Sequence, residues 1–354
     1  MRNKKLSGEE ALLEAQKIAF GPVVFQTARL LRDFGIFQLL QDNKAKGCSV
    51  EFIAKDKNLS EYAVEVLCES GLSMNALSME DEHYFLTNVG YFLLVDEMTN
   101  INMNFNHDVN YQGLFYLEES LKESKPVGLQ KVFDESFETI YPFLSKLPKN
   151  AKKSWFEFDH FYSDTAFKPL VKVMKEKAPK KLMDVGGNTG KWAITITKAM
   201  SNIEVTILDH QEQIDVAMVK AKEANVQERV NGTAMDLLDH TKAFPKEYDA
   251  IWMSQFLDCF SKEDIIALLK RAKAALSKDG RVYINEPFWD RQSHGIGSYV
   301  LINTSVYFSA LANGTSKMYR AKEMKKLAQE AGLEVIEEIN GLGFGHTLMV
   351  CASI

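Results

Sequence analysis

The second half of the chain alternates between strand-like and helix-like segments, and this alternation restricts the possible folds more than any other feature. The strand-like segments, rich in apolar and β-branched residues, are 181–185, 204–209, 230–235, 248–254, 281–287, 334–340 and 347–353. Strands that alternate with helices predict a parallel sheet with helices on both faces. Only residues 341–346 separate the last two strands. That length is too short for a parallel crossover, so we expect these two strands to form an antiparallel hairpin in an α/β domain.

The clearest helix of this half is expected at residues 261–280. Ser261 and Asp264 form a variant of the capping box at its start, and Gly280 is expected to end it. Apolar residues at helical spacing make one face, namely Ile265, Leu268, Leu269, Ala272 and Leu276.

The first half of the chain is expected to be mainly helical, with helix breaks at Gly21 and Gly35. Ser49 and Ser60 are N-cap candidates for two short helices, and residues 83–95 are expected to form a strand and a turn. Two short helices followed by a β-wing are typical of a winged helix. The expected division is a winged-helix-like domain at residues 1–105, connecting helices at 106–175 and an α/β domain at 176–354.

The composition is that of an ordinary globular protein, with 46% hydrophobic residues and a net charge of −6. No run approaches the ~18 apolar residues of a membrane span, and the N-terminal segment lacks the apolar centre of a signal peptide. The four cysteines lie far apart without metal-ligand spacing, so we expect reduced thiols. These features predict a cytoplasmic protein with no membrane association and no metal site.

A glycine-rich turn, residues 184–190 (DVGGNTG), follows the first strand. A dinucleotide fingerprint places glycines at the first, third and sixth positions, but counting from Gly186 the latter two hold Asn188 and Lys191. A phosphate-binding P-loop would require glycine where Val185 stands. The turn is therefore expected to bring backbone close to a ligand without a pyrophosphate cradle. Asn188 is expected to adopt positive φ, which asparagine tolerates better than most residues.

Acidic residues stand at the ends of the next two strands. Asp209, 19 residues after Gly190, is placed to accept both hydroxyls of a ribose. Asp236 and Leu237 follow the third strand, where they suit an adenine amino group and the apolar face of its ring. Each residue alone is as compatible with a helix cap as with a ligand contact. Because they stand at successive strand ends of an open sheet, together they favour a binding site. Together they predict binding of the adenosyl part of S-adenosylmethionine.

Five blocks of the sequence resemble, in this order, those of class I O-methyltransferases such as the plant caffeate, acetylserotonin and bacterial polyketide or carotenoid enzymes. The blocks are DVGGNTG (184–190), LDHQEQI (208–214), YDAIWMSQFLDCFSKEDIIALL (248–269), GRVYINEPF (280–288) and YRAKEMKKLAQEAGLEV (319–335). The resemblance implies a Rossmann-like seven-stranded catalytic domain that binds S-adenosylmethionine and a small-molecule acceptor. It also implies that residues 1–105 form a homodimer and that residues 106–175 contribute to the active site.

The resemblance also assigns roles by position. The residues implied to line the cofactor are Asp184, Gly186, Gly187, Gly190, Asp209, His210, Asp236, Leu237, Ser254 and Ser163. On residue type rather than on the resemblance, Phe161 and Tyr307 are candidate aromatic walls for the acceptor, and His160 is a candidate imidazole beside it. Tyr319 is the fourth residue expected to meet the acceptor. Glu286 matches a supporting acid of the catalytic group.

The chain departs from the family at the catalytic base. The family places a histidine in a Leu-His-Asp-Trp block, and the matching residues 257–260 read Leu-Asp-Cys-Phe. Asp258 therefore takes the base position. Tyr319 stands where the plant enzymes have a glutamate before an arginine.

Three readings of Asp258 stay open. An unperturbed aspartate lies roughly six pKa units below a phenol, an uphill proton transfer of roughly 8 kcal/mol; burial beside Phe256, Phe260 and Glu286 would reduce that gap, making Asp258 a tuned base. Alternatively the acceptor is itself acidic and Asp258 orients it. In the third reading, methyl transfer is lost and Asp258 caps the helix near Ser261.

Other chemistries at this position also stay open. His160 or His294 would supply an imidazole, and Asp258, Glu286 and a histidine would form a remote candidate metal set. The acceptor atom is carbon or nitrogen in alternative readings, because the cofactor half is common to all of them.

A winged helix raises the rival hypothesis of a DNA-binding regulator. The candidate recognition helix, SEYAVEVLCESGL (60–72), carries three glutamates and no lysine or arginine. Phosphate contacts require cations, so we expect no nucleic-acid partner. Tight retention on heparin at low salt would contradict this expectation.

Overall fold

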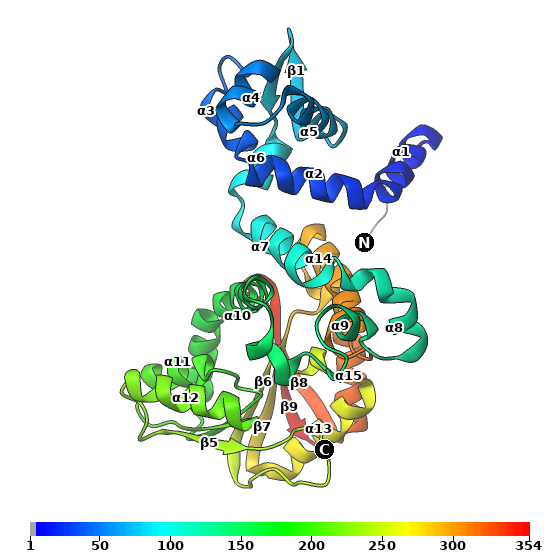
Figure 1. Cartoon of the computed structure of the whole chain (residues 1–354). Coiled ribbons are helices and arrows are strands. Elements are labelled where there is room, and N and C mark those ends of the chain that lie inside the picture. Colours follow the sequence, from blue (N-terminus) through cyan, green and yellow to red (C-terminus); the bar gives the residue numbers. More distant parts are fainter. Residues whose placement is uncertain (1–4) are drawn as a thin grey trace. The chain divides into compact units, whose positions relative to one another are not determined.

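The computed structural model describes residues 5–354 and is shown in Figure 1. The chain divides into two compact units, with the division between Asn106 and His107. Each unit contains its own clusters of buried apolar side chains. Within the described residues, no helix is both long and apolar enough to cross a membrane.

The N-terminal unit is mainly helical and contains a small antiparallel hairpin. Its elements are α1 (Gly8–Ala19), α2 (Gly21–Asp33), α3 (Ile36–Asp42), α4 (Val50–Lys57), α5 (Glu61–Ser73), β1 (Leu77–Glu80), β2 (His83–Leu86), α6 (Asn88–Val95) and α7 (Glu97–Phe105). The predicted breaks are confirmed, since Gly35 adopts a φ of 73° between α2 and α3. The predicted caps are confirmed as well: the Ser49 and Ser60 side chains accept hydrogen bonds from the first turns of α4 and α5.

The prediction for residues 83–95 was only half correct. Residues 83–86 form strand β2, but Asn88–Val95 is helix α6, which begins at the N-cap Thr87. The Thr87 hydroxyl accepts from the Gly90 N–H at 3.3 Å and donates to the Asn75 carbonyl. A short apolar run does not distinguish a strand from a helix by periodicity, and the cap that decides between them depends on a partner 12 residues earlier.

The C-terminal unit begins with short helices and continues into a seven-stranded sheet. The helices before the sheet are α8 (Leu117–Glu123), α9 (Val127–Val132), a 3-10 helix at Tyr141–Lys146 (η3) and the long α10 (Lys149–Lys177). The strands are β3 (Lys181–Val185), β4 (Glu204–Asp209), β5 (Val230–Ala234), β6 (Tyr248–Ser254), β7 (Leu276–Glu286), β8 (Leu333–Leu342) and β9 (His346–Ser353). The helices among them are α11 (Lys191–Ala199), α12 (Gln211–Glu223), α13 (Lys262–Ala275), α14 (Gly295–Tyr307) and α15 (Ala321–Glu330).

The strand order is β5-β4-β3-β6-β7-β9-β8. The strands from β5 to β7 pair in parallel, whereas β9 is antiparallel to both β7 and β8. The predicted parallel sheet with an antiparallel closing hairpin is therefore confirmed. The order also shows that β9, the last strand in the sequence, lies inside the sheet rather than at its edge.

The predicted end of the helix at residues 261–280 was wrong. The Ser261 cap is present, but α13 ends at Ala275. Leu276 is already the first residue of β7 and pairs with Tyr248 of β6. Gly280 does not end the helix; it lies within β7, where an added Cβ would be 2.6 Å from the Tyr248 carbonyl oxygen. The close approach of two strands, rather than helix termination, therefore explains why residue 280 is a glycine.

Helices cover both faces of the sheet, as Figure 1 shows. On one face, α10, α11 and α12 pack over apolar residues that include the stacked Trp192 and Trp252, whose ring centroids are 4.5 Å apart. On the other face, α13 and α15 pack over residues such as Met253 and Ile284. Both faces of the central strands are thus buried, which explains the continuous apolar runs in their sequences.

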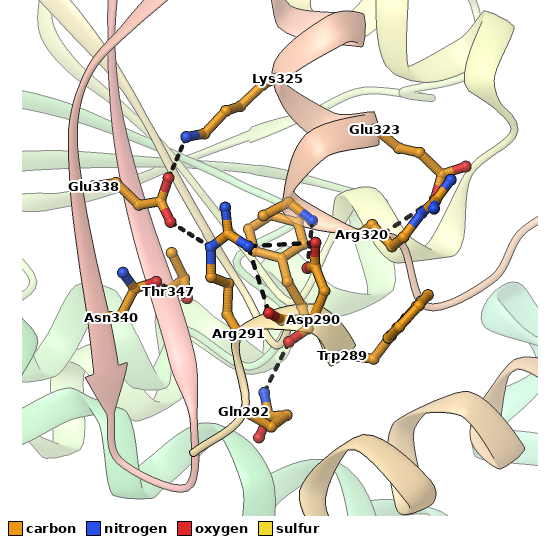
Figure 2. Close-up of polar contacts among 12 residues, drawn as sticks. Trp289, Asp290, Arg291, Gln292, Arg320, Glu323, Lys325, Glu338, Asn340 and Thr347 are labelled. Carbon is orange, nitrogen blue, oxygen red and sulfur yellow. Dashed lines mark hydrogen bonds and ion pairs between the residues drawn. The ribbon is translucent and has the colours of Figure 1, made fainter. Parts of the chain in front are cut away.

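A network of ion pairs ties the segment after β7 to α15 and to β8 (Figure 2). Arg291 donates to Glu338 of β8 at 2.6 Å, and Lys325 of α15 pairs with the same carboxylate. Burial alone would raise the pKa of Glu338, but the two cations outweigh it and hold that pKa below its usual range. Asp290 of the same segment accepts from the backbone N–H of Ala321 at the start of α15. The network anchors the chain just beyond the end of β7.

Candidate active site

A cavity of about 520 Å³ opens within the C-terminal unit, at the carboxyl ends of the parallel strands. Its walls come from the turn after β3, the end of β4, the segments after β5 and β6, helix α10 and residues 136–144. Carboxyl ends of parallel strands are where open α/β sheets bind ligands. The sequence-predicted residues that line it are Gly186, Asp209, His210, Asp236 and Leu237.

The glycine turn after β3 has the backbone conformation predicted for it. Gly186 and Gly190 adopt φ angles of 71° and 75°, and Asn188 adopts a φ of 48°. A side chain at Gly186 would meet the ring of Phe256 at 2.3 Å, and one at Gly187 would meet Asp184 and Ile207 at 2.8 Å. The turn is therefore tightly packed, and Gly186 and Asn188 line the cavity.

Asp209 is held at the end of β4 by two backbone hydrogen bonds. Its Oδ2 accepts from the Asn188 N–H at 2.9 Å, and its Oδ1 accepts from the His210 N–H at 2.7 Å. Burial nevertheless raises the pKa of Asp209, as it raises that of the neighbouring Asp184 to about 7. Each carboxylate oxygen of Asp209 has a second lone pair for a ligand hydroxyl.

The remaining predicted cofactor residues lie around this group without lining the cavity. Asp184 and Gly187 support the turn, and Gly190 starts α11. The Ser254 hydroxyl, at the end of β6, accepts a hydrogen bond from Asn285 at 2.9 Å. Ser163 lies on α10, with its hydroxyl bonded to the His160 carbonyl in its own helical turn.

Three carboxyl groups lie near one another at the cavity. Asp159 of α10 lines it, and Asp258 and Glu286, which are 6% and 2% exposed, lie behind. Burial and the charge of Asp258 raise the pKa of Asp159 to about 7, and burial raises that of Asp258 to about 6. Burial and Asp258 also raise the pKa of Glu286 well above its usual range. We refer to Asp159, Asp258 and Glu286 as the carboxyl cluster.

Glu286 has a structural task within this cluster. Its Oε1 accepts from the backbone N–H groups of Phe256 and Leu257, at 3.0 and 2.9 Å. It thereby fixes the start of the short 3-10 helix Leu257–Cys259 (η4), which carries Asp258. Ser261, not Asp258, caps α13, so the reading of Asp258 as the cap of that helix was wrong.

Aromatic and sulfur groups surround the cluster. Trp155 lines the cavity one turn before Asp159 on α10, and its indole N–H donates to the Tyr307 hydroxyl at 2.7 Å. Tyr141 also lines the cavity, and the Cys259 thiol donates to Asp258 at 3.5 Å. Burial raises the pKa of both Tyr141 and Cys259 well above their usual values. These groups therefore stay neutral, and the charge at this end depends on the carboxyl cluster.

The four residues predicted to meet the acceptor do not appear in the cavity wall. His160 is half-buried, and burial lowers its pKa. Phe161 stacks on Phe344 of the β8–β9 turn with ring centroids 4.9 Å apart. Tyr307 lies behind Trp155, and the Tyr319 hydroxyl donates to the Phe260 carbonyl at 2.8 Å. His294, the other candidate imidazole, is exposed at the start of α14.

Sequence reasoning missed several residues that do line the cavity. Asp159 stands within residues 106–175, which were expected to contribute to the active site, one helical turn after Trp155, and that spacing was the available signal. Tyr141, Phe143 and Asn313 lie in segments with no recognisable motif. Nothing local marks them, because their position depends on how η3 and the segment that follows α14 pack on the strand ends.

The sheet order, the glycine turn and the acidic strand ends together define an S-adenosylmethionine-dependent methyltransferase. A family model described as the O-methyltransferase domain matches residues 149–334, and one described as the Dimerisation2-like domain matches residues 13–84. The chain belongs to this O-methyltransferase family and carries its dimerisation domain.

Individual relatives agree with this assignment. The chain is 27% identical over 318 residues to an L-tyrosine C(3)-methyltransferase of Streptomyces lavendulae, covering 89% of this chain and 85% of that protein. It is 25% identical over 293 residues to a bacteriochlorophyllide d C-20 methyltransferase of Chlorobaculum tepidum, covering 77% and 78%.

Solved structures share the fold. The methyltransferase SibL in its apo form aligns with a TM-score of 0.71 at 22% identity, over 95% of this chain and 98% of that one. The mitomycin 7-O-methyltransferase MmcR aligns with a TM-score of 0.72 at 14% identity, over 97% and 98%.

The residues present fit S-adenosylmethionine. Asn188 and Gln255 line the cavity, and each has a buried side-chain oxygen without a hydrogen-bond partner in residues 5–354. Such atoms are expected where a polar ligand completes the wall. Among the same residues, no group of three or more His, Cys, Asp or Glu side chains is arranged to hold a metal ion.

Proposed function

We propose that this methyltransferase acts on the oxygen of a small phenolic acceptor, and that a buried carboxyl group takes the phenolic proton. The observation that supports this proposal most directly is the carboxyl cluster, with Asp258 at the position where the resembling enzymes have histidine. Of the described residues that line the cavity, the one imidazole is His210, next to Asp209 at the end of β4.

The cofactor, when bound, supplies the electrophilic methyl group. Asp209 would bind the ribose hydroxyls, Asp236 and Leu237 would contact the adenine, and the turn at Gly186 would admit the ligand close to the backbone. These contacts fix the position of the methyl group relative to the carboxyl cluster, and positioning is the main demand of an in-line displacement.

The raised pKa values make a carboxyl base effective. A phenol has a pKa near 10, so a base with a pKa of about 6 (Asp258) or about 7 (Asp159) leaves a gap of roughly three to four units. That gap corresponds to roughly 4–5 kcal/mol, against roughly 8 kcal/mol for an unperturbed aspartate. In the proposed step, the oxygen–hydrogen bond breaks, the carboxylate keeps the proton, and the phenolate electron pair forms the new bond to the methyl carbon.

The walls of the cavity suit a flat aromatic acceptor. Aromatic side chains line it from three parts of the chain: Tyr141 and Phe143, Trp155, and Phe256 and Phe260. Aromatic walls with a few polar groups are typical of sites for small aromatic ligands.

Methylation of a ring carbon is the second candidate. It is favoured by the relative that is described as an L-tyrosine C(3)-methyltransferase and that aligns over 89% of this chain. A ring carbon next to a phenolic hydroxyl becomes nucleophilic once the hydroxyl loses its proton, so the same carboxyl base would serve. The product, rather than the site, distinguishes the two reactions.

We expect Asp258→Asn to lower kcat about 100-fold, because a general base contributes about 10²–10⁴-fold. The assay is turnover of a panel of phenols with S-adenosylmethionine, with the new methyl group located on oxygen or carbon by NMR. S-adenosylhomocysteine should bind the variant within twofold of wild type. Asp279→Asn, an exposed change of the same kind, serves as the control. Retention of a third or more of wild-type kcat in Asp258→Asn would remove Asp258 as the base.

The dimerisation domain supports a further proposal, a homodimer formed through the N-terminal unit. Helix α1 buries none of its residues, although it carries a series of large apolar side chains. Those exposed by more than half of their surface in and beside it are Leu12, Leu13, Ile18 and Phe20. An exposed apolar series of this kind is typical of an interaction surface.

Light scattering is expected to give twice the mass of the chain for wild type. Replacing Leu13 and Ile18 together by glutamate should give a monomer, because the charges would have to be buried. Val219→Glu, at an exposed position of α12 in the other unit, is the control and should remain a dimer. A monomeric wild type at micromolar concentration would contradict the proposal.

A further inference from the structure

The charges on the cavity wall are unevenly distributed. Of the described residues that line the cavity, Glu138, Asp159, Asp209, Asp236 and Asp264 are acidic, and none is lysine or arginine. A wall of this composition attracts cations and repels anions. Five carboxyl groups are more than the net positive charge of S-adenosylmethionine and a neutral phenolic acceptor would balance.

Most of these acidic groups already accept hydrogen bonds or are exposed to solvent. Asp209 accepts two backbone hydrogen bonds, and Asp236 accepts one from Leu238. Asp264 bonds to Ser261 and His240, and Glu138 is exposed. Asp159 differs from all of them, because its carboxylate is only partly exposed and accepts no hydrogen bond from another side chain or backbone group within residues 5–354. The opposite charge that acts on it is that of Lys191, which is paired with Asp164.

The groups behind Asp159 add to the imbalance. Asp258 and Glu286 are almost fully buried, and Glu286 Oε2 has no hydrogen-bond partner in the described part of the chain. Buried carboxylates without a cation are costly, so such groups either keep a proton or wait for a ligand that brings a positive charge. The raised pKa values of all three groups agree with this account.

Asp159 lies close to residues that we assign to the acceptor. It shares α10 with Trp155, and its charge acts on Asp258 and on Tyr307. The turn at Gly186 and Asp209 comes from β3 and β4 instead. Trp155, one helical turn before Asp159, and Tyr141 line the same cavity, and aromatic rings favour a neighbouring cation.

We propose that the acceptor carries a protonated amine in addition to its phenolic ring, and that Asp159 receives the ammonium group inside the cavity. This proposal rests on the proposed function, since it names the substrate class of the same site. A salt bridge to Asp159 would orient the ring with its hydroxyl toward Asp258, so that one carboxylate holds the acceptor while another takes the proton. Phenolic amines and aromatic amino acids have this chemistry.

The test compares matched probes on the protein saturated with S-adenosylhomocysteine, by calorimetry at pH 8. Tyramine carries an ammonium group, and tyrosol has a neutral hydroxyl in the same place. We expect tyramine to bind at least about tenfold more tightly, because a sheltered ion pair adds more than a neutral hydrogen bond. Asp159→Asn should reduce that preference to within about threefold and leave S-adenosylhomocysteine binding unchanged. Glu157→Gln, on the same helix but outside the cavity wall, should keep the full preference.

The wild-type comparison alone is decisive, even if a variant fails to fold. Equal or weaker binding of tyramine, or no measurable binding while S-adenosylhomocysteine binds, overturns the proposal and leaves the methyltransferase assignment intact. Asp159→Glu should restore part of the preference if the charge is what matters. Asp159→Asn could instead weaken the binding of S-adenosylmethionine relative to that of S-adenosylhomocysteine and keep the tyramine preference. In that case Asp159 interacts with the sulfonium group, and the proposal is wrong. Failure of S-adenosylhomocysteine to bind folded wild type would contradict the proposed function itself.

Discussion

Asp209→Ala is expected to weaken the binding of S-adenosylmethionine by at least about 100-fold, since hydrogen bonds to a charged group contribute about 1.5–3 kcal/mol each. The carboxylate lies at the end of β4, is held by two backbone hydrogen bonds and lines the cavity. Removing it also leaves the N–H groups of Asn188 and His210 without their acceptor. The measurement is calorimetric titration with S-adenosylmethionine and S-adenosylhomocysteine.

Asp215→Ala is the matched control, because Asp215 is exposed on the adjoining helix α12. Its dissociation constants should equal those of wild type within twofold. Circular dichroism and thermal unfolding would verify that Asp209→Ala is folded. If the folded variant binds within fivefold of wild type, Asp209 does not hold the ribose, and the sequence-based placement of the adenosine has to be revised.

Wild type is expected to lose about 3 kcal/mol of stability, relative to His346→Leu, as the pH falls from 7.5 to 4. His346 begins β9 and is 1% exposed, and burial lowers its pKa to about 4. An unfolded histidine has a pKa near 6.5. Because the folded pKa is the lower one, the unfolded state binds the proton first. The stability is therefore fully present above pH 6.5 and is lost as the pH falls through this window.

Comparison with His346→Leu is needed because the buried carboxyl groups act in the opposite direction. The pKa of Asp184 and of Asp159 is raised to about 7, so their contribution to stability falls as the pH rises toward neutrality. These groups are present in both proteins and cancel in the difference. The measurement is the unfolding free energy of the two proteins at several pH values. A difference that does not change between pH 7.5 and 4 would show that folding does not lower the pKa of His346.

The sheet could be predicted from the sequence because its signals are local. Each of the seven strands stands in a distinct apolar segment, and six connecting residues were enough to require the hairpin of β8 and β9. The positive φ of Asn188 was likewise a property of one residue type in one turn. Predictions failed where a distant partner decides the outcome, as at Gly280, which faces the Tyr248 carbonyl, and at Thr87, which bonds to Asn75.

The residues of the site also fall into a predictable and an unpredictable group. The residues at the ends of β3, β4 and β5 were predictable, because parallel strands bring their carboxyl ends to one edge. Asp159 was not predicted, since its position depends on the orientation of a 29-residue helix. The neighbouring His160 and Phe161 were preferred on residue type, yet a rotation of about 100° per residue takes adjacent side chains of a helix to different sides.

The position of β9 has a consequence for synthesis of the protein. This strand lies between β7 and β8 and supplies Thr347, Leu348 and Met349 to the interior of the unit. During translation, the sheet therefore stays divided until residues 346–353 have left the ribosome, and β8 has no neighbouring strand before then. The nascent chain must hold a two-part, unclosed sheet for that period, with apolar strand surfaces of the kind that chaperones bind. Closure of the sheet thus waits for a strand that follows all the other strands in the sequence.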